Sequence, residues 1–439
     1  MSKENKHALS KVEGLIPELR FPEFKNEGEW FGDTLINIAK FRRGSFPQPY
    51  GLPEWYDELN GIPFIQVYDV GDNFRLKPKT KSKISKLGAE QSVFIPKGTV
   101  IITIQGSIGR VAITQYDAYI DRTLLLFEEF YNEIDKTFFA YVLFMLFEIE
   151  KLKAPGGIIK TITKEVLSDF VISIPKLPEQ QKIASCLSSL DEVIAAHSQK
   201  LELLKDHKKG LMQNLFPHPS ASSGSGMVAE PAEAKVPKLR FKEFEKDGEW
   251  EEKKLGELGE FLGGGTPSRT NTEYWKGNIP WISSSDISED DIHNISISQY
   301  INEIAIVESA TKIIPKGSIL FVSRVGVGKL AVSKEELCTS QDFTSFIPRK
   351  ILNYFVAYYY SAKKSALESL SQGTSIKGFS KNDLEDSRIL FPKNPKEQQK
   401  IASCLSSLDA LITAQAEKIE QLKLHKKGLM QGLFPKIND

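Results

Sequence analysis

The stretch "QQKIASCLSSLD" occurs twice in this chain, letter for letter, first as Gln180–Asp191 and again as Gln398–Asp409. Two further pieces, "HKKGLMQ" and "LFP", follow each copy at the same distance. A repeat of this length does not arise by chance. The chain therefore contains an internal duplication.

The duplication covers nearly the whole chain, but its identity is uneven. Ahead of the long match, "IPELRFPEF" from Ile16 resembles "VPKLRFKEF" from Val236, and "IPKG" from Ile95 returns from Ile314. The identity is almost complete after Pro175 and weak before it. Two constant segments therefore alternate with two divergent ones.

The constant segment has the spacing of a coiled-coil helix. Its seam positions recur at alternating steps of four and three residues, a pattern that lets two helices pack along a narrow line. Because such a stripe is not stable alone in water, we expect the two copies to pack on each other. The predicted seam consists of Ile183, Leu187, Leu190, Ile194, His197, Leu201 and Leu204, and of Ile401, Leu405, Leu408, Ile412, Gln415, Ile419 and Leu422.

A two-fold relation between the duplicated halves would make these helices antiparallel. The seam is polar near the middle of each copy, at His197 and Gln415, and antiparallel pairing with aligned centres would bring these two side chains close together. They either fix the register, as polar seam residues do in other coiled coils, or are tolerated on a wet part of the seam.

The divergent segments are typical of mixed α/β modules. Runs such as "GTVIITI" and "GSILFVS" are rich in β-branched residues and predict strands, whereas Lys136–Leu152 and Leu352–Leu370 predict helices. The expected fold class is α+β (mixed), with two α/β modules separated by two long antiparallel coiled-coil helices in a pseudo-two-fold tandem repeat. The expected boundaries are a tail at 1–15, the first module at 16–175, the first helix at 176–217, a Ser/Gly-rich linker at 218–235, the second module at 236–392, the second helix at 393–435 and a tail at 436–439.

Composition and charge disfavour several functional classes. The chain has 57 Lys and Arg against 57 Asp and Glu, and a net charge of zero does not suit binding of nucleic acid by bulk electrostatics alone. Its three cysteines form no clustered Cys/His spacing, which predicts a reduced protein without a metal site. No apolar run approaches the roughly 20 residues of a membrane span, and "MSKENKHALS" lacks the apolar core of a secretory signal. We expect a cytoplasmic protein with no membrane association and no cofactor.

Polar, glycine-containing turns in the divergent segments supply candidate DNA contacts. "TIQGSIGR" and "SRVGVGK" are counterparts, and glutamine suits adenine while arginine suits guanine in the major groove. The alternative readings are an ordinary structural turn for these loops, a solvated face for the "RR" pair and helix capping for "SSSD". "VGVGK" lacks the spacing of a phosphate loop, because Leu330 follows its lysine. The candidates are Arg42, Arg43, Gln105, Ser107, Arg110, Lys160, Arg269, Ser284, Arg324, Lys329 and Lys377.

No catalytic constellation is visible in the sequence. His207 and His425 lie in "HKK" runs, which are typical of a solvated or partner-docking helix face. No paired carboxylates and no nucleophile with a neighbouring base stand at a recognisable spacing. The sequence therefore predicts a protein that is not an enzyme.

Taken together, the order of segments and their motifs resemble those of a known family. The marks are "LPEQQKIASCLSSLD", "PKEQQKIASCLSSLD", the "HKKGLMQ" and "LFP" endings, "PKLRF", "GGGTPSR" and "NIPWISSSDI". They are similar to the specificity subunit of type I restriction–modification systems over nearly the whole chain. The Ser/Gly-rich linker, whose "SSGSGM" resembles a recent or synthetic junction, departs from the family pattern.

The resemblance implies a function. Each divergent module would be a target recognition domain for one half of a bipartite, asymmetric site in double-stranded DNA. The repeated helices would set the spacing and dock two methyltransferase subunits, through which restriction subunits could join. The alternative is a stand-alone two-module DNA-binding regulator, which the zero net charge disfavours. An enzyme fits less well, because the sequence shows no methyltransferase cofactor or base-flipping motif. A plain coiled-coil scaffold also fits less well, because it would leave the two divergent modules without a role.

Overall fold

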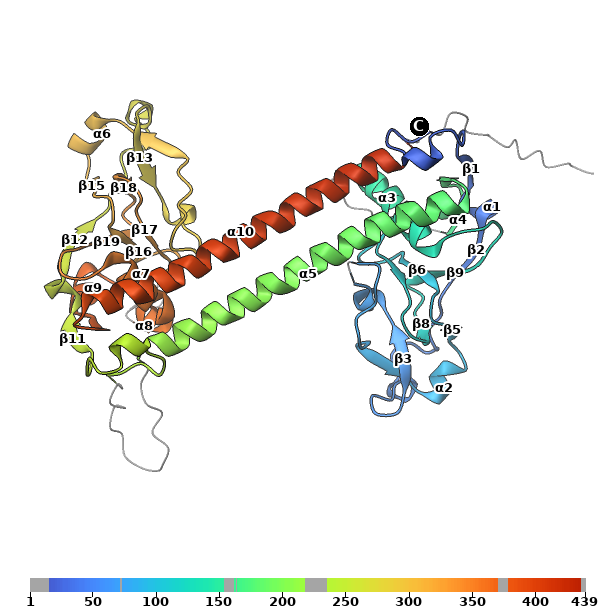
Figure 1. Cartoon of the computed structure of the whole chain (residues 1–439), viewed down its shortest axis with the longest axis horizontal. Helices are drawn as coiled ribbons and strands as arrows, with labels where there is room; N and C mark the ends of the chain where they lie inside the picture. The colour runs from blue at the N-terminus through green and yellow to red at the C-terminus, as the bar shows by residue number, and fades with distance from the viewer. Residues whose placement is uncertain are drawn as a thin grey trace, which may run out of the picture. The chain divides into compact units, whose positions relative to one another are not determined.

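The computed structural model describes residues 16–71, 73–153, 162, 164–217, 235–369 and 378–435. It consists of two units, Met1–Gln199 with Glu417–Asp439, and Lys200–Ala416. We call them unit 1 and unit 2. Each unit contains one divergent module together with part of both long helices (Figure 1). Of the predicted linker only Lys235 is described, and both predicted tails lie outside the described residues.

The module of unit 1 contains two four-stranded sheets. The first is antiparallel and has the order β2 (Ala39–Arg43), β9 (Leu124–Phe130), β6 (Val100–Thr103), β7 (Val111–Ile113). The second has the order β4 (Ser82–Ile84), β3 (Ile62–Ile65), β8 (Ala118–Ile120), β5 (Val93–Ile95), in which β3 and β8 are parallel. An antiparallel ribbon joins β1 (Phe31–Thr34) to β10 (Val171–Ile174), and the helices are α1 (Leu35–Ile38), α2 (Lys86–Ala89), α3 (Lys136–Lys153) and α4 (Lys164–Ser168).

The module of unit 2 has the same strand order. Its first sheet is β12 (Gly259–Gly263), β19 (Phe343–Pro348), β16 (Ile319–Val322), β17 (Leu330–Val332), and its second is β14 (Gln299–Ile301), β13 (Ile279–Ile282), β18 (Leu337–Thr339), β15 (Ile313–Ile314). The ribbon pairs β11 (Glu251–Lys254) with β20 (Arg388–Phe391), and the helices are α6 (Glu303–Val307), α7 (Asn353–Ala362), α8 (Lys364–Ser369) and α9 (Lys381–Asp386). The predicted tandem repeat of mixed α/β modules is confirmed.

The core of each module lies between the first sheet and the helix that follows it. In unit 1 all four residues of β6 are buried, and Phe138, Tyr141 and Phe147 of α3 are fully buried against this sheet. In unit 2 the apolar run predicted as one helix over Leu352–Leu370 forms α7 and α8, which meet at Lys363. The β-branched run that predicted the strand β6 therefore corresponds to a strand that is buried on both faces of its sheet.

The two constant segments form the long helices α5 (Leu177–Leu215) and α10 (Pro395–Leu433). In unit 1 the Lys426 ammonium lies 2.6 Å from the Asp191 carboxylate, and Phe434, just beyond α10, shares a core with Leu187 near the start of α5. In unit 2 Lys208 of α5 pairs with Asp409 of α10 at 2.5 Å. Within each unit the two helices therefore run antiparallel, as predicted (Figure 1).

Each module is closed by the end of the helix that belongs to the other repeat. In unit 1 the Phe434 ring lies 5.5 Å from Phe138 and 6.2 Å from Trp30, centroid to centroid. In unit 2 the Phe216 ring lies 5.7 Å from Phe355 and 6.5 Å from Trp250. The repeated "LFP" is thus a core segment, and its aromatic ring fills the neighbouring repeat's module.

The start of each constant segment is fixed to its own module by a repeated set of polar contacts. Arg20 makes two hydrogen bonds to the buried Glu179 carboxylate, at 2.8 and 2.7 Å, and Arg240 does the same to Glu397 at 2.8 Å each. The side chain of Gln180 accepts a hydrogen bond from the Asp135 backbone and donates one to Pro175. Gln398 repeats this with Leu352 and Pro392. Part of the identity between the repeats therefore has an internal structural cause.

The predicted seam residues are buried or half-buried throughout, and none is exposed. Ile183 and Leu187, like Ile401 and Leu405, belong to the module cores, so the first turns of the seam contact the module. Gln415 is buried and His197 half-buried, but they lie in different units. Their predicted pairing stays a prediction, as do the domain boundaries given above.

We expect Phe434→Ala to lower the free energy of unfolding of unit 1 by about 3–5 kcal/mol, because it empties an aromatic site in a closed core. Leu424→Ala on α10 of the same unit is the matched control, since Leu424 is 68% exposed and its loss should change stability by less than about 0.5 kcal/mol. Urea unfolding followed by tryptophan fluorescence measures both. Equal effects of the two substitutions would contradict the closure of the core by Phe434.

The second prediction concerns the acid dependence of unit 2. Burial alone would raise the pKa of Asp409, but hydrogen bonds from His293, Lys208 and Tyr358 outweigh it and lower this pKa below its ordinary value of 3.8. The unfolded chain therefore binds the Asp409 proton more tightly than the native state does. The stabilisation is present above pH 3.8 and is lost as the pH falls below that value.

Asp409→Asn should consequently destabilise unit 2 by about 3 kcal/mol at neutral pH, because it leaves Lys208 without its charged partner in a largely buried site. The difference from the unmodified protein should shrink as the pH falls below 3.8. Unfolding curves over a pH series test this. Asp386→Asn, which removes an exposed carboxylate, serves as control, and a difference that grows toward acid would refute the assignment.

Candidate nucleic-acid interface

Turns from both sheets of each module meet along one edge, which we call the loop edge. In unit 2 it comprises residues 263–271, 283–286, 323–329 and 340–342. Backbone hydrogen bonds fix these turns, from Gly265 to Thr339 at the end of β18 at 2.8 Å, and from Ser323 to Asp342 of a neighbouring turn at 2.7 Å. Loops that are fixed to one another in this way can present side chains at defined positions.

Unit 1 has the same edge, formed by residues 43–51, 66–71, 104–110 and 121–123. Its turns are joined by hydrogen bonds from the Ser45 backbone to Ile120 and from Ile104 to Thr123, both at 3.0 Å. The equivalence of the two edges follows from the equal strand orders of the modules. The sequences of these loops differ between the units, so the edges present different side chains on the same backbone frame.

The turn between β6 and β7, and its counterpart between β16 and β17, require glycine. Gly109 has a φ of +83°, and a Cβ there would lie 2.7 Å from the Phe147 ring. Gly326 and Gly328 each have a φ of +98°. Both turns therefore close tightly over the core, and they hold Gln105 half-buried, Ser107 exposed and Arg324 exposed at the loop edge.

Arg110 and Lys329 occupy equivalent places at the end of these turns, and both are half-buried. Arg110 donates from Nη1 to the Val70 carbonyl at 3.1 Å, and Lys329 Nζ lies 3.5 Å from the Ser284 carbonyl. Each side chain thus ties its turn to the neighbouring turn of the second sheet. This geometry supports a positioning role, and the predicted contact of these two residues with DNA stays a prediction.

The "SSSD" segment forms the capped turn that the alternative reading proposed. The Asp286 carboxylate accepts hydrogen bonds from the Ser283 backbone at 2.7 Å and from its hydroxyl at 2.8 Å. Asp69 plays the same part in unit 1, accepting from the Gln66 backbone at 2.8 Å, and burial raises its pKa. Ser284 itself is half-buried at the first position of this turn.

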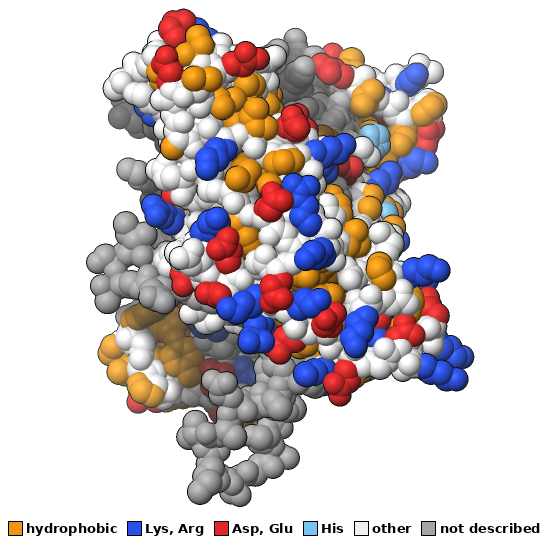
Figure 2. Space-filling model, turned by 90° about the vertical axis from the view of Figure 1, so that its left-hand side faces the viewer, with side chains coloured by type: hydrophobic (Ala, Val, Ile, Leu, Met, Phe, Trp, Pro, Cys, Tyr) orange, Lys and Arg blue, Asp and Glu red, His pale blue; other side chains and the backbone are white. Residues whose placement is uncertain are grey.

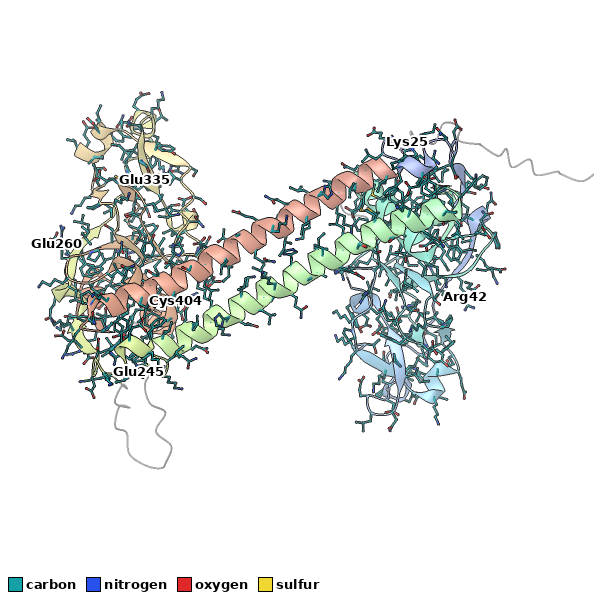
Figure 3. All side chains as sticks on the ribbon, viewed as in Figure 1. Lys25, Arg42, Glu245, Glu260, Glu335 and Cys404 are labelled. Carbon is teal, nitrogen blue, oxygen red and sulfur yellow. The ribbon has the colours of Figure 1, made fainter. Side chains whose placement is uncertain are left out.

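The remaining predicted cations differ in their surroundings. Arg42 and Arg43 are exposed on β2, and Arg42 lies 3.8 Å from Glu128 (Figure 3). Lys160 and Lys377 lie outside the described residues. On the face seen in Figure 2, Lys and Arg alternate with Asp and Glu and do not gather into one basic patch.

Two features of the loop edge were not found from the sequence. Arg122, in "DRT", is exposed with its guanidinium carbon 5.4 Å from the centroid of the Tyr50 ring. Arg269 was predicted as a DNA contact, but its stacking on Trp275, with the guanidinium carbon 3.9 Å from the ring centroid, was not predicted. Comparing "DRT" (121–123) with its counterpart "SQD" (340–342) would have marked this turn as divergent.

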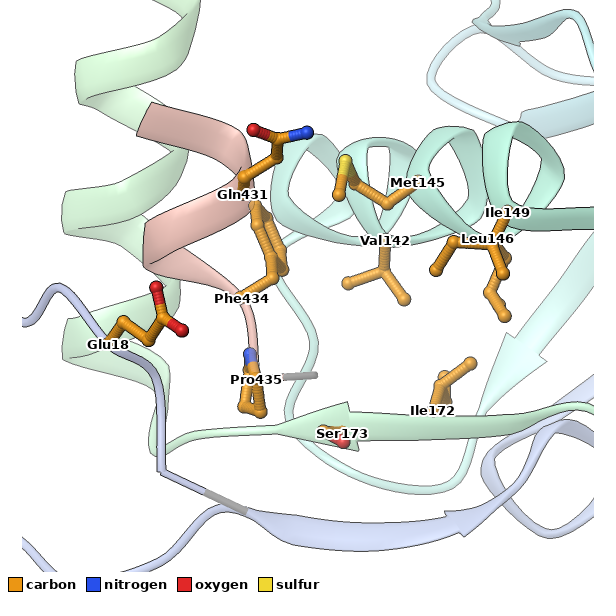
Figure 4. A pocket seen from close by; sticks show the side chains of 10 residues that line it. All are labelled: Glu18, Val142, Met145, Leu146, Ile149, Ile172, Ser173, Gln431, Phe434 and Pro435. Carbon is orange, nitrogen blue, oxygen red and sulfur yellow. The ribbon is translucent and has the colours of Figure 1, made fainter. Parts of the chain in front are cut away.

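A cavity of about 410 Å³ in unit 1 lies between α3, β10 and the end of α10 (Figure 4). Its lining is mostly apolar, with Glu18 and Gln431 among its polar members. Across the described ranges, no group of three or more His, Cys, Asp or Glu side chains is arranged to hold a metal ion. None of the helices described here has the length and apolar character that a membrane crossing needs.

Comparison with protein families gives two matches within this chain. The type I restriction modification DNA specificity domain matches residues 56–206 and again 247–424, which together make up more than half of the sequence. Each match includes most of one divergent module and much of the long helix that follows it. The two matches thus reproduce the internal duplication.

Curated relatives and solved structures agree with this result. The specificity subunit of type I restriction enzyme MjaIX from Methanocaldococcus jannaschii is 36% identical over 190 residues, which cover 42% of this chain and 44% of that one. The putative MjaX specificity subunit of the same organism is 28% identical over 436 residues, or 91% of this chain and 96% of the relative. The S subunit of a type I restriction–modification system from M. genitalium shares the fold, with a TM-score of 0.59 at 16% identity over 96% of this chain and 100% of that chain.

The loop edge generates a prediction for Arg324. Arg324→Ala should reduce discrimination at a single base pair by about 1–3 kcal/mol, because a base-reading arginine loses its paired hydrogen bonds. Sequencing of duplexes that the full-length chain retains from a random pool at low salt measures this. Arg388→Ala, an exposed arginine that pairs with Glu252 on the ribbon, is the control. An unchanged base preference would remove Arg324 from the interface.

Proposed function

The chain belongs to the type I restriction modification DNA specificity family, and from this premise we propose that it selects the DNA sequence for a restriction–modification complex. The observation that carries the proposal is that the two units share one backbone architecture but differ in the side chains of their loop edges. The two units have the same strand order and the same helix contacts, yet their loop edges carry different side chains. Such a molecule suits the recognition of two different half-sequences.

Equivalent positions of the two edges carry different side chains, which supports the reading of two different half-sequences. Gln105 of unit 1 corresponds to Arg324 of unit 2, and Arg122 corresponds to Gln341. Glutamine pairs with adenine and arginine with guanine in the major groove, so each exchange changes the preferred base. The target is therefore bipartite and asymmetric, with one half read by each module.

The long helices set the distance between the half-sites. Each contains 39 residues, which gives a length of roughly 60 Å at about 1.5 Å per residue. Such helices would act as a ruler that holds the two readers about one helical turn of DNA apart, a spacing on the order of 34–36 Å.

The same helices offer two equal docking sites for methyltransferase subunits. Several exposed residues of the repeat are identical in both copies, as in Gln181 and Gln399, although others differ, as in Asp206 and Leu424. Val193 and Leu411 stand at matching positions and remain 43% and 58% exposed, which leaves an apolar contact point on each helix. Two identical partners would therefore bind, and restriction subunits would join through them.

The subunit itself would carry no catalytic activity and no cofactor. Among the described residues, the largely buried charged group around Asp409 has a structural role, and methyl transfer would be supplied by the partners. It would act on chromosomal and incoming DNA in the cytoplasm. A stand-alone regulator is less well supported, because a chain of zero net charge lacks the electrostatic attraction that sustains tight binding alone.

Exchange of one module tests the proposal. Replacing residues 236–392 with the equivalent module of a relative should change one half of the methylated sequence and leave the other half unchanged, because each half is read by a separate loop edge. Sequencing of methylated bases in a host that carries the partner subunits measures this. A matched replacement of 16–175 should change the opposite half, and the purified chain alone should not methylate DNA. A change of both halves by one exchange would refute independent reading.

A further inference from the structure

An arginine stacks on a layered set of aromatic rings at the loop edge of unit 2. Trp281 is buried, with 1% of its surface exposed, and donates from Nε1 to the Gly265 carbonyl at 3.0 Å. Trp275 packs edge-on against it at 5.0 Å and donates to the Ser268 carbonyl at 3.2 Å. The guanidinium of Arg269 lies 3.9 Å from the centroid of Trp275. The outermost layer, the arginine, is exposed to solvent.

Unit 1 has a corresponding stack built from other residues. Phe46 is buried and packs on Phe64 at 5.7 Å. Tyr50 lies 4.3 Å from Phe46 and is 60% exposed. The guanidinium of Arg122 lies 5.4 Å from the Tyr50 centroid. Here too a buried ring supports a more exposed ring, which in turn supports an exposed arginine.

The two arginines are not equivalent in the duplication. Arg122 belongs to the turn 121–123, whose counterpart carries Gln341, and Arg269 belongs to the loop that carries Tyr50 in unit 1. The same two loops meet in both units, since Thr266 donates a hydrogen bond to Gln341 in unit 2. Divergent modules thus place a stacked arginine at the same junction from opposite sides. Because the two arginines stand at positions that do not correspond, the duplication alone does not explain them, and their common location points to a common function.

Stacking prepares a guanidinium for planar recognition. The ring covers one face of the group and limits its rotation, while the N–H edges stay available to a ligand. Arg269 uses one N–H to reach Gln299 at 2.9 Å, which further fixes its orientation. Among the residues that the structure describes, no carboxylate forms an ion pair with either arginine, whereas Arg20, Arg240 and Arg349 are paired in this way.

We propose that Arg122 and Arg269 each read a guanine, one in each half of the target, and that Tyr50 and Trp275 are positioning residues for them. This inference rests on the proposed function. An arginine fork matches O6 and N7 of guanine in the major groove, and a fork held in advance loses less conformational freedom on binding. The exposed edge of a stacked arginine at the loop junction meets both requirements.

The test uses the full chain assembled with its methyltransferase subunits and a library of randomised targets, read by sequencing of methylated products. Arg122→Lys keeps the charge but removes the fork. It should lower the preference for guanine at one position of one half-site by about ten-fold or more. Arg269→Lys should do the same at one position of the other half-site. Arg388→Lys, an arginine paired with Glu252 away from the loop edge, is the matched control and should change neither half.

The positioning role needs a separate readout. Tyr50→Leu and Trp275→Leu should weaken the preference at the same positions as the arginine variants, and Tyr50→Phe and Trp275→Phe should restore it, because a ring is again present. Thermal unfolding of each assembled complex separates this from loss of the fold. Leucine variants that lower methylation of all sequences alike would overturn the positioning role.

Unchanged base preferences in both lysine variants would overturn the guanine assignment while leaving the proposed function in place. A complex with the unmodified chain that methylates without sequence preference would instead refute the proposed function. The two failures are therefore distinguishable in one experiment.

Discussion

A phenylalanine from one repeat closes the core of the module that belongs to the other repeat. Phe434 fills the space beside Trp30 and Phe138, and Phe216 fills the equivalent space beside Trp250 and Phe355. The charged pairs of Lys426 with Asp191 and of Lys208 with Asp409 lie on the same helices nearby. Because each long helix begins in the core of its own module and ends in the core of the other, each constant segment must fit two equivalent sites, one at each end.

The loop edges are free of this constraint. Their backbones are tied by hydrogen bonds between turns, such as those from Gly265 and Ser323, and these do not depend on which side chain the turn carries. Gln105 could become Arg324, and Pro49 could become Arg269, without a change in strand order. A rigid frame with replaceable edge residues lets one fold carry two different sets of edge side chains.

The long helices and the mixed modules could be predicted from the sequence because their signals are local. Apolar residues that recur at alternating steps of four and three predict a coiled-coil seam, and β-branched runs such as Val100–Thr103 predict buried strands. The packing site of "LFP" could not be predicted. A proline after an apolar pair indicates only that a helix ends, and the residues that contact the phenylalanine ring lie far away in sequence. The loop edge was harder still. Arg110 and Arg324 look alike in sequence, and only the fold shows that the first is held by Val70 while the second is exposed.

The packing of each helix end in the module of the other repeat also bears on how the protein folds during synthesis. Translation proceeds from the first repeat to the second, so the ribosome has completed the first module long before it reaches Phe434. Domains usually fold in the order of their synthesis, yet here the core of the first module stays open until the last helix is finished. A nascent chain must keep Trp30 and Phe138 from misassembling during that interval, and a prematurely terminated chain leaves that core open.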